Sequence, residues 1–170
     1  MAAVSRHNTF YGSRKMEDNK PLIDRFTKES GYEFLSNFHP STVRFEGSLY
    51  PTLEHAYQAA KTIDIKTRET IRKAKSPAEA KKLGHAIPVR EDWLEARLEI
   101  MRALVREKFE NPFLRPMLLG TGDAELVLNN KWNDTFWGIC RGVGENWLGK
   151  ILVEERERIR KEDIHDSSLV

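Results

Sequence analysis

The amino-acid sequence predicts an α+β fold, namely a single, mostly helical domain with a small sheet of short strands. Signals for helix starts and ends recur from about residue 51 to residue 161. The segments with alternating apolar residues are short and lie close to glycine and proline. No linker, internal repeat or low-complexity stretch divides the 170 residues, which is enough chain for one domain with a hydrophobic core.

Short strands are expected where apolar and polar residues alternate outside the helical segments. Residues 42–45 and 48–50 flank Glu46-Gly47, which predicts a hairpin with a tight turn. This hairpin leads the chain into the first helix. The expected strands are 23–26, 42–45, 48–50 and 125–128.

The helices are predicted mainly from the residues at their ends. Thr52 is a suitable N-cap for a helix after Pro51. Ser76 is followed by Pro77 and Glu79, which is typical of a helix start, and Gly84 is a suitable C-cap. The further helices are expected over 67–74, 76–84, 93–110, 112–119 and 146–161. The last helix is expected to face the core with Leu148, Ile151, Leu152 and Ile159.

The two ends of the chain are expected to lie outside the globular part. Residues 1–22 are mostly polar and irregular, which indicates an N-terminal arm. The domain is expected over residues 23–161. Residues 162–170 are interpreted as a C-terminal tail.

Composition narrows the class of protein. Hydrophobic residues make up 39% and charged residues 32%, which is typical of a globular chain, and a net charge of +2 is too small to indicate a nucleic-acid-binding protein. A single cysteine, Cys140, excludes an internal disulfide and fits a reducing compartment. No apolar run approaches the ~20 residues of a membrane helix, and no signal-peptide core follows the first residues.

These observations predict a cytoplasmic protein that does not enter a membrane. The five histidines lack metal-ligand spacing, so neither a metal nor another cofactor is expected. No obligate protein partner is evident from the sequence.

The strongest candidate for chemistry is the helix that follows Pro51. At 3.6 residues per turn, Glu54, Gln58 and Lys61 fall within about 60° of one another on one face. A second face is apolar and mostly small, with Leu53, Ala56, Ala60 and Ile63. A buried helix that carries a carboxylate, an amide and an amine in one row indicates a functional site, because such groups are rarely buried without a use. The alternative is a solvated stripe beside a packed His55.

Further candidates lie in loops and at a helix start. Ser36 and Asn37 sit in an aromatic frame, which is typical either of a ligand-binding loop or of a turn that bonds its own backbone. Trp137 is either a stacking face for a base or a core residue. Two arginines and one asparagine complete the set, since Arg44 and Arg90 are candidate phosphate contacts and Asn146 is either a helix N-cap or a substrate contact.

Six ordered motifs carry a family resemblance. They are Phe34-Leu35-Ser36-Asn37-Phe38, the segment from Glu54-His55 through Gln58 to Lys61, Arg90-Glu91-Asp92-Trp93, Leu118-Leu119-Gly120-Thr121-Gly122, Asp134-Thr135-Phe136-Trp137-Gly138 and Asn146-Trp147-Leu148-Gly149-Lys150-Ile151-Leu152. Between them, Ala80-Lys81-Lys82-Leu83-Gly84 and later Met101, Lys108 and Phe109 follow in the order that the resemblance expects. The chain resembles the NADAR family of YbiA-like N-glycosidases over about residues 31–158. The resemblance implies cleavage of the bond between ribose and a base nitrogen. Its implied substrates are ADP-ribose on guanine bases or early riboflavin-pathway ribosylamino-pyrimidine phosphates.

The resemblance implies roles for the candidate residues. Glu54 would stabilise charge or move a proton, and Lys61 would form a Schiff base with ribose C1. Gln58 would orient substrate or water between them. The loop with Asp134, Trp137 and Gly138 would form the second half of the site, with Asp134 bonding ribose hydroxyls or holding Lys61.

One position departs from the family pattern. Leu128 stands where many members carry a glutamate, which puts the choice of substrate in doubt more than the reaction. The leading hypothesis is a hydrolase that removes ADP-ribose from guanine in nucleic acid or nucleotides. The alternatives are an N-glycosidase for a small riboflavin-pathway substrate and a non-catalytic module that binds ADP-ribose or a nucleotide.

Overall fold

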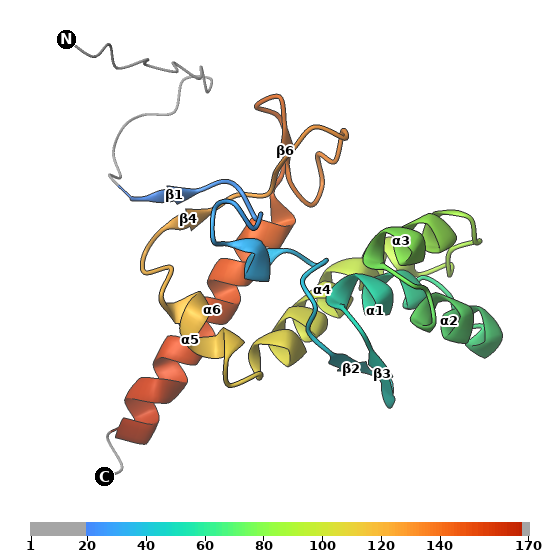
Figure 1. The fold of residues 1–170 in the computed structure, drawn as a ribbon, viewed down its shortest axis with the longest axis horizontal. Helices are drawn as coiled ribbons and strands as arrows, with labels where there is room; N and C mark the ends of the chain where they lie inside the picture. Colours follow the sequence, from blue (N-terminus) through green and yellow to red (C-terminus); the bar gives the residue numbers. More distant parts are fainter. Residues whose placement is uncertain (1–19, 168–170) are drawn as a thin grey trace.

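The computed structural model describes residues 20–167, so nearly all of the expected N-terminal arm and the last three residues lie outside it. The predicted α+β class is confirmed, with helices dominating and only short strands present (Figure 1). In chain order the elements are β1 (Leu22–Ile23), the 3-10 helix η1 (Glu33–Leu35), β2 (Val43–Phe45), β3 (Ser48–Tyr50), α1 (Leu53–Ala59), α2 (Ile65–Arg72), α3 (Pro77–His85), α4 (Trp93–Phe109), α5 (Leu114–Leu119), β4 (Glu125–Leu126), β5 (Asn129–Asn130), β6 (Ile139–Cys140) and α6 (Trp147–Ser167).

The strands form three separate pairs within the described residues. β2 and β3 make the predicted antiparallel hairpin, in which Val43 faces Tyr50. Its turn residues Glu46 and Gly47 both have positive φ, at 44° and 81°, as the tight turn requires. β1 pairs with β4 and β5 with β6, both in parallel. A strand was expected over residues 23–26, but the observed strand β1 covers only Leu22 and Ile23.

Helix starts with a side-chain cap agree with the prediction in two cases. The Thr52 side chain accepts a hydrogen bond from the His55 backbone N–H, and Ser76 accepts one from the Glu79 backbone N–H. α2 begins at Ile65, two residues earlier than expected, because Asp64 caps it by accepting from the Thr67 backbone N–H at 2.7 Å.

Two helix ends differ from the prediction. α3 continues through Gly84 to His85, so Gly84 is a helical residue and not the residue after the helix. α6 continues past Lys161 to Ser167, which corrects the expected tail at residues 162–167. Arg115 of α5 pairs with Glu162 and Asp163 at 3.2 and 2.7 Å, and these contacts support the extra turn.

The long helices α4 and α6 pack together and connect the two ends of the molecule (Figure 1). α1 packs against α2, α3 and α4, near the β2–β3 hairpin. α6 packs against α5 and β4 on the other side. The expected core face of α6 is buried, and it meets the α4 residues Met101, Leu104, Val105 and Phe109 in one hydrophobic cluster.

α1 is buried on every side, from Leu53 to Ala59. The exposed fractions of Glu54 and Gln58 are 6% and 2%, so these two residues do not form a solvated stripe. Ile63, in contrast, is 75% exposed and does not join the apolar face as expected. The helical spacing no longer applies there because α1 ends at Ala59.

Candidate active site

A cavity of about 770 Å³ lies beside α1, and it gathers residues from several separate parts of the chain. Its walls come from α1, α3, α4 and the loops around residues 25–27, 36–38 and 128–137. It is lined by Arg25, Phe26, Thr27, Ser36, Asn37, Phe38, Glu54, Tyr57, Gln58, Lys61, Lys81, His85, Trp93, Arg97, Met101, Leu128, Asn129, Trp132, Asn133, Asp134, Phe136, Trp137 and Leu148. The predicted row of Glu54, Gln58 and Lys61 therefore faces one cavity.

Glu54 is held in place through its backbone and its carboxylate. Its backbone N–H donates to the Asn37 carbonyl at 3.0 Å, and its Oε1 accepts from Gln58 Nε2 at 2.7 Å. Burial raises the pKa of Glu54, while the Gln58 hydrogen bond and the charges of Lys81 and Lys61 oppose this shift. The carboxyl group thus retains a proton to higher pH than an exposed glutamate.

Lys61 follows the end of α1 and reaches back into the cavity. Its carbonyl accepts from the Arg90 backbone N–H at 2.7 Å, and its Nζ lies 3.5 Å from the Gly84 carbonyl oxygen. Burial lowers the pKa of Lys61; Glu54 opposes this shift and Lys81 adds to it. A larger fraction of this amine is therefore neutral, and so nucleophilic, than for an exposed lysine at the same pH.

Aromatic rings form a continuous wall of the cavity. Tyr57 lies between Trp93 and Trp137, with ring centroids 5.2 and 5.4 Å apart, and Phe136 meets Trp137 edge-on at 4.8 Å. Trp137 packs against the hydrophobic core, as one of the two sequence interpretations predicted, and it also lines the cavity. Lys61 Nζ lies 5.9 Å from the centroid of Tyr57, at one end of this wall.

Asp134 shapes the loop that presents Trp137. Its Oδ1 accepts from the backbone N–H groups of Phe136 and Trp137 at 3.2 and 2.8 Å. Asn130 braces the same loop, donating to the Asp134 carbonyl at 2.7 Å and accepting from its backbone N–H. Asp134 also lines the cavity, so it combines a structural role with access to a ligand.

The 36–38 segment forms the predicted turn and also lines the cavity. Ser36 Oγ accepts from the Phe38 backbone N–H at 3.2 Å, which is the turn interpretation. Asn37 Oδ1 is buried and has no hydrogen-bond partner among the described residues. Since Asn37 lines the cavity, this oxygen is a candidate acceptor for a ligand donor.

The structure places four predicted site residues outside the cavity lining. Arg44 is exposed on β2, where its backbone N–H donates to Glu107, and Arg90 pairs with Asp92 at 2.5 Å. Asn146 Oδ1 accepts from the Leu128 backbone N–H, and its Nδ2 donates to the Leu126 carbonyl. Gly138 is packed so closely that a Cβ would lie 2.2 Å from the Leu128 carbonyl oxygen. Their observed contacts are structural.

Sequence reasoning did not assign a site role to four basic residues that line the cavity, namely Arg25, Lys81, His85 and Arg97. Lys81 and His85 lie on α3, and the guanidinium carbon of Arg97 on α4 lies 3.5 Å from the centroid of Phe136. The i, i+4 spacing of Lys81 and His85 was a visible signal. It was not sufficient, because the spacing does not say which face of α3 meets α1.

The sequence predicts no metal site and no membrane-spanning helix, and the observations on these two points cover residues 20–167. Within residues 20–167, no group of three His, Cys, Asp or Glu side chains is arranged to hold a metal ion. No helix in this part of the chain is long and apolar enough to cross a bilayer.

The fold and this site define a NADAR domain. The model of the NADAR domain family matches residues 25–160, and the chain belongs to this family. It is 37% identical over 142 residues to the N-glycosidase YbiA of Escherichia coli, which covers 81% of this chain and 88% of YbiA. The NMR structure of Escherichia coli YbiA superposes with a TM-score of 0.77 at 35% identity, covering 89% of this chain and 92% of the other.

A second relative is a larger protein. The chain is 38% identical over 140 residues to the riboflavin biosynthesis protein VVA0006 of Vibrio vulnificus. The match covers 80% of this chain but only 38% of the Vibrio protein. These comparisons confirm the family resemblance that the six sequence motifs predicted.

Proposed function

We propose that this protein is an N-glycosidase, a hydrolase that cleaves the bond between ribose C1 and a base nitrogen. The observation that carries the proposal is the buried row of Glu54, Gln58 and Lys61 facing one cavity. Relatives that bear the name N-glycosidase support it. A buried carboxyl group beside a half-buried amine, with their pKa values moved toward each other, suits proton transfer coupled to nucleophilic attack.

The proposed reaction begins with opening of the ribose ring. The C1–O4′ bond breaks as O4′ receives a proton from Glu54, and the lone pair of the base nitrogen forms a C1=N bond. The neutral Lys61 Nζ then adds to C1. Glu54 carries one proton from Nζ to the base nitrogen, and the C1–N bond to the base breaks as the Nζ lone pair forms a protonated C1=Nζ Schiff base.

Water completes the proposed cycle. It adds to C1 of the Schiff base and gives one proton to the Glu54 carboxylate; its second proton passes to Nζ as the C1–Nζ bond breaks, which restores protonated Glu54 and neutral Lys61. The products are the free base and a ribose with an aldehyde at C1, which can close its ring. Gln58, hydrogen-bonded to Glu54, holds the carboxylate in one orientation during these proton transfers.

The proposed substrate is ADP-ribose attached to guanine. The cavity volume of about 770 Å³ lies in the upper part of the range for small-molecule sites, about 300–1,000 Å³. The aromatic wall of Tyr57, Trp93 and Trp137 offers flat faces for a purine. A ribosylamino-pyrimidine phosphate is the second candidate, because one relative is named a riboflavin biosynthesis protein.

The decisive experiment is a borohydride trap. The protein is incubated with ADP-ribosylated guanosine, reduced, and examined by peptide mass spectrometry for a ribose-containing adduct. We expect the adduct on Lys61, its loss in Lys61→Ala, and its persistence in the control Lys82→Ala, whose side chain is exposed on α3 outside the cavity lining.

The other outcomes separate the alternatives. Released guanosine without an adduct would keep the glycosidase and overturn the Schiff base. Turnover of the ribosylamino-pyrimidine phosphate alone would refute the assignment of ADP-ribosylated guanine as the substrate. Saturable binding of both compounds without any product would overturn the enzyme and leave a binding module.

A further inference from the structure

Two basic side chains of α3 line the cavity beside the proposed nucleophile. Lys81 and His85 are one helical turn apart and both line the cavity. Lys61 Nζ lies 3.5 Å from the carbonyl oxygen of Gly84, the residue before His85. Three basic groups thus meet at one end of the cavity.

This cationic end has little compensating charge within the protein. Among residues 20–167, no ion pair is formed by Lys61, Lys81 or His85. The charge of Glu54 raises the pKa of Lys61, and the charges of Lys61 and Lys81 in turn lower the pKa of Glu54. Burial lowers the pKa of His85, and the charges of Lys61 and Lys81 lower it further. An anion bound here would relieve this mutual repulsion.

Lys81 is also held toward the cavity. It is half-buried, and its Nζ lies 5.5 Å from the centroid of Trp132, another cavity residue. Its neighbour Lys82 on the same helix is, in contrast, exposed. A partly ordered ammonium that lacks a carboxylate is a suitable phosphate contact.

From this arrangement we infer that Lys81 and His85 form a phosphate-binding subsite for the ribosyl part of the substrate. The inference rests on the proposed function and adds which residues bind the phosphate of the substrate. Lys81 contributes a point charge and His85 an imidazole N–H donor. Their location on α3 places the phosphate beside Lys61 and so brings ribose C1 within reach of the amine. Arg97, which stacks on Phe136 of the 134–138 loop, is not part of this subsite.

The test is a binding measurement that requires no turnover. Full-length protein is titrated with ribose 5-phosphate, ribose and ADP-ribose by NMR or calorimetry. We expect ribose 5-phosphate to bind at least about tenfold more tightly than ribose, since the phosphate accepts charge-assisted hydrogen bonds that ribose lacks. Lys81→Gln should remove most of that preference, and Lys81→Arg should restore part of it. The matched control Lys82→Gln should keep the wild-type preference.

ADP-ribose distinguishes two sources of the phosphate. If Lys81→Gln weakens ADP-ribose as much as ribose 5-phosphate, the subsite accepts a diphosphate. If it weakens ribose 5-phosphate alone, the subsite accepts a terminal monophosphate. Either result supports an anionic subsite on α3. Equal binding of ribose and ribose 5-phosphate, or equal effects of Lys81→Gln and Lys82→Gln, would overturn it.

A kinetic measurement separates this inference from the proposed function. With a phosphorylated and a dephosphorylated riboside substrate, Lys81→Gln should raise KM about tenfold for the phosphorylated one only and leave kcat within about threefold. Absence of turnover with phosphate-dependent binding intact would refute the glycosidase and retain the subsite. Turnover that does not depend on the phosphate would retain the glycosidase and refute the subsite.

Discussion

At the scale of single residues, burial changes the chemistry of lysine most clearly at Lys108. Its side chain is 1% exposed, and its Nζ donates to the Ser36 carbonyl at 2.7 Å. No carboxylate pairs with it among the described residues, and burial lowers its pKa to about 7. Lys108 thereby anchors the loop whose Asn37 carbonyl holds the Glu54 backbone.

This burial predicts a specific dependence of stability on pH. In the unfolded chain lysine keeps its proton up to a pKa of about 10.4, whereas folded Lys108 loses it near pH 7. Between these values the unfolded state binds more protons, so the free energy of unfolding rises with pH, by at most about 1.4 kcal/mol per pH unit. Lys108→Met should lack this contribution. Urea unfolding at about pH 7.5 and about pH 9.5 measures it.

The comparison needs a lysine that does not change environment on folding. Lys82 is exposed, so Lys82→Met should retain the wild-type pH slope. If Lys108→Met also retained that slope, the amine would not titrate as inferred.

The second prediction at this scale concerns Glu54 and Lys61. Because burial raises the pKa of Glu54 and lowers that of Lys61, the pH profile of kcat/KM should be bell-shaped. Its two limbs should lie closer together than the ordinary values of about 4.3 and about 10.4. Because the proposed reaction starts with Glu54 protonated and Lys61 neutral, Glu54→Gln should abolish the alkaline limb and reduce kcat about 10²–10⁴-fold. Glu95→Gln, at an exposed position of α4, should change neither.

At the scale of elements, the site depends on a close approach of α1 and α3. Gly84 lies so near Gln58 that an added Cβ would be 2.1 Å from Gln58 Oε1. The absence of a side chain at Gly84 therefore lets Gln58 reach Glu54. The same absence lets Lys61 Nζ approach the Gly84 carbonyl.

Gly84→Ala should consequently damage both stability and activity. We expect a loss of about 1–3 kcal/mol in the free energy of unfolding, as for other overpacked positions, and a fall in kcat from the displaced Gln58. Gly120→Ala is a suitable control, because its Cβ would meet its nearest neighbour at 3.3 Å. Equal effects of the two substitutions in urea unfolding and activity assays would contradict this account.

Element boundaries were predicted where the signal is local. Thr52 and Ser76 were recognisable as caps because the bond each accepts comes from three residues further along the chain. The prediction that Ile63 belongs to the apolar face of α1 was wrong, because it assumed that the helix continues beyond Ala59. The strands were predicted as one small sheet, but β1–β4 and β5–β6 join residues distant in sequence, and their pairing depends on tertiary packing.

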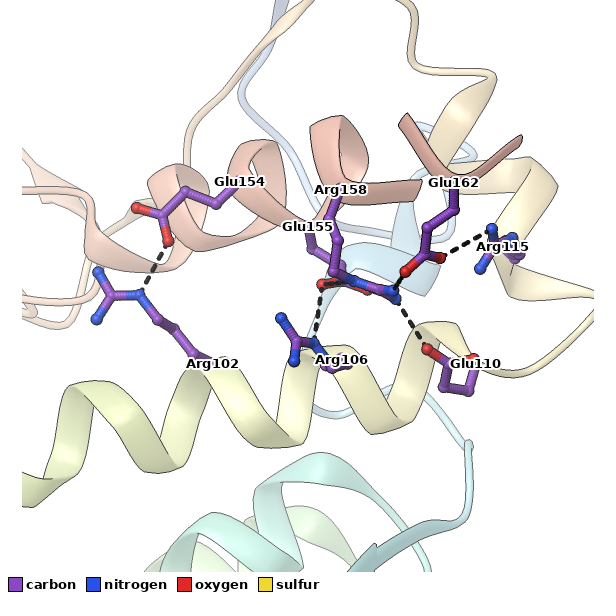
Figure 2. A network of polar contacts seen from close by, with 8 residues as sticks. All are labelled: Arg102, Arg106, Glu110, Arg115, Glu154, Glu155, Arg158 and Glu162. Atoms are coloured by element: carbon purple, nitrogen blue, oxygen red, sulfur yellow. Dashed lines mark hydrogen bonds and ion pairs between the residues drawn. The ribbon is translucent and has the colours of Figure 1, made fainter. Parts of the chain in front are cut away.

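At the scale of the whole molecule, an ion-pair network joins α4, α5 and α6 (Figure 2). Arg158 is its centre, since it pairs with Glu155 at 2.6 Å, with Glu110 at 2.8 Å and with Glu162. Glu155 is only 6% exposed, so its charge relies on Arg158 and on the more distant Arg106. The network residues on α4, α5 and α6 do not line the cavity.

Removing the centre of this network should weaken the fold without altering the chemistry. Arg158→Leu should cost about 3 kcal/mol, because it leaves the buried Glu155 charge largely unpaired. Arg102→Leu, whose partners Glu99 and Glu154 are exposed, should cost under about 1 kcal/mol. Urea unfolding measures both, and kcat should stay at the wild-type value in each. Similar costs for the two variants would show that Glu155 does not depend on Arg158.

The sequence by itself determined the local features of this protein. Helix caps, the hairpin turn and the row of Glu54, Gln58 and Lys61 follow from spacings within a few residues, which the geometry of a helix or a turn converts directly into contacts. The six motifs also predicted the family correctly. Tertiary structure alone decided the rest of the cavity. Lys81, His85 and Arg97 line it, whereas Arg44, Arg90 and Asn146 do not, because the docking of α3, α4 and the loops against α1 selects the faces that meet.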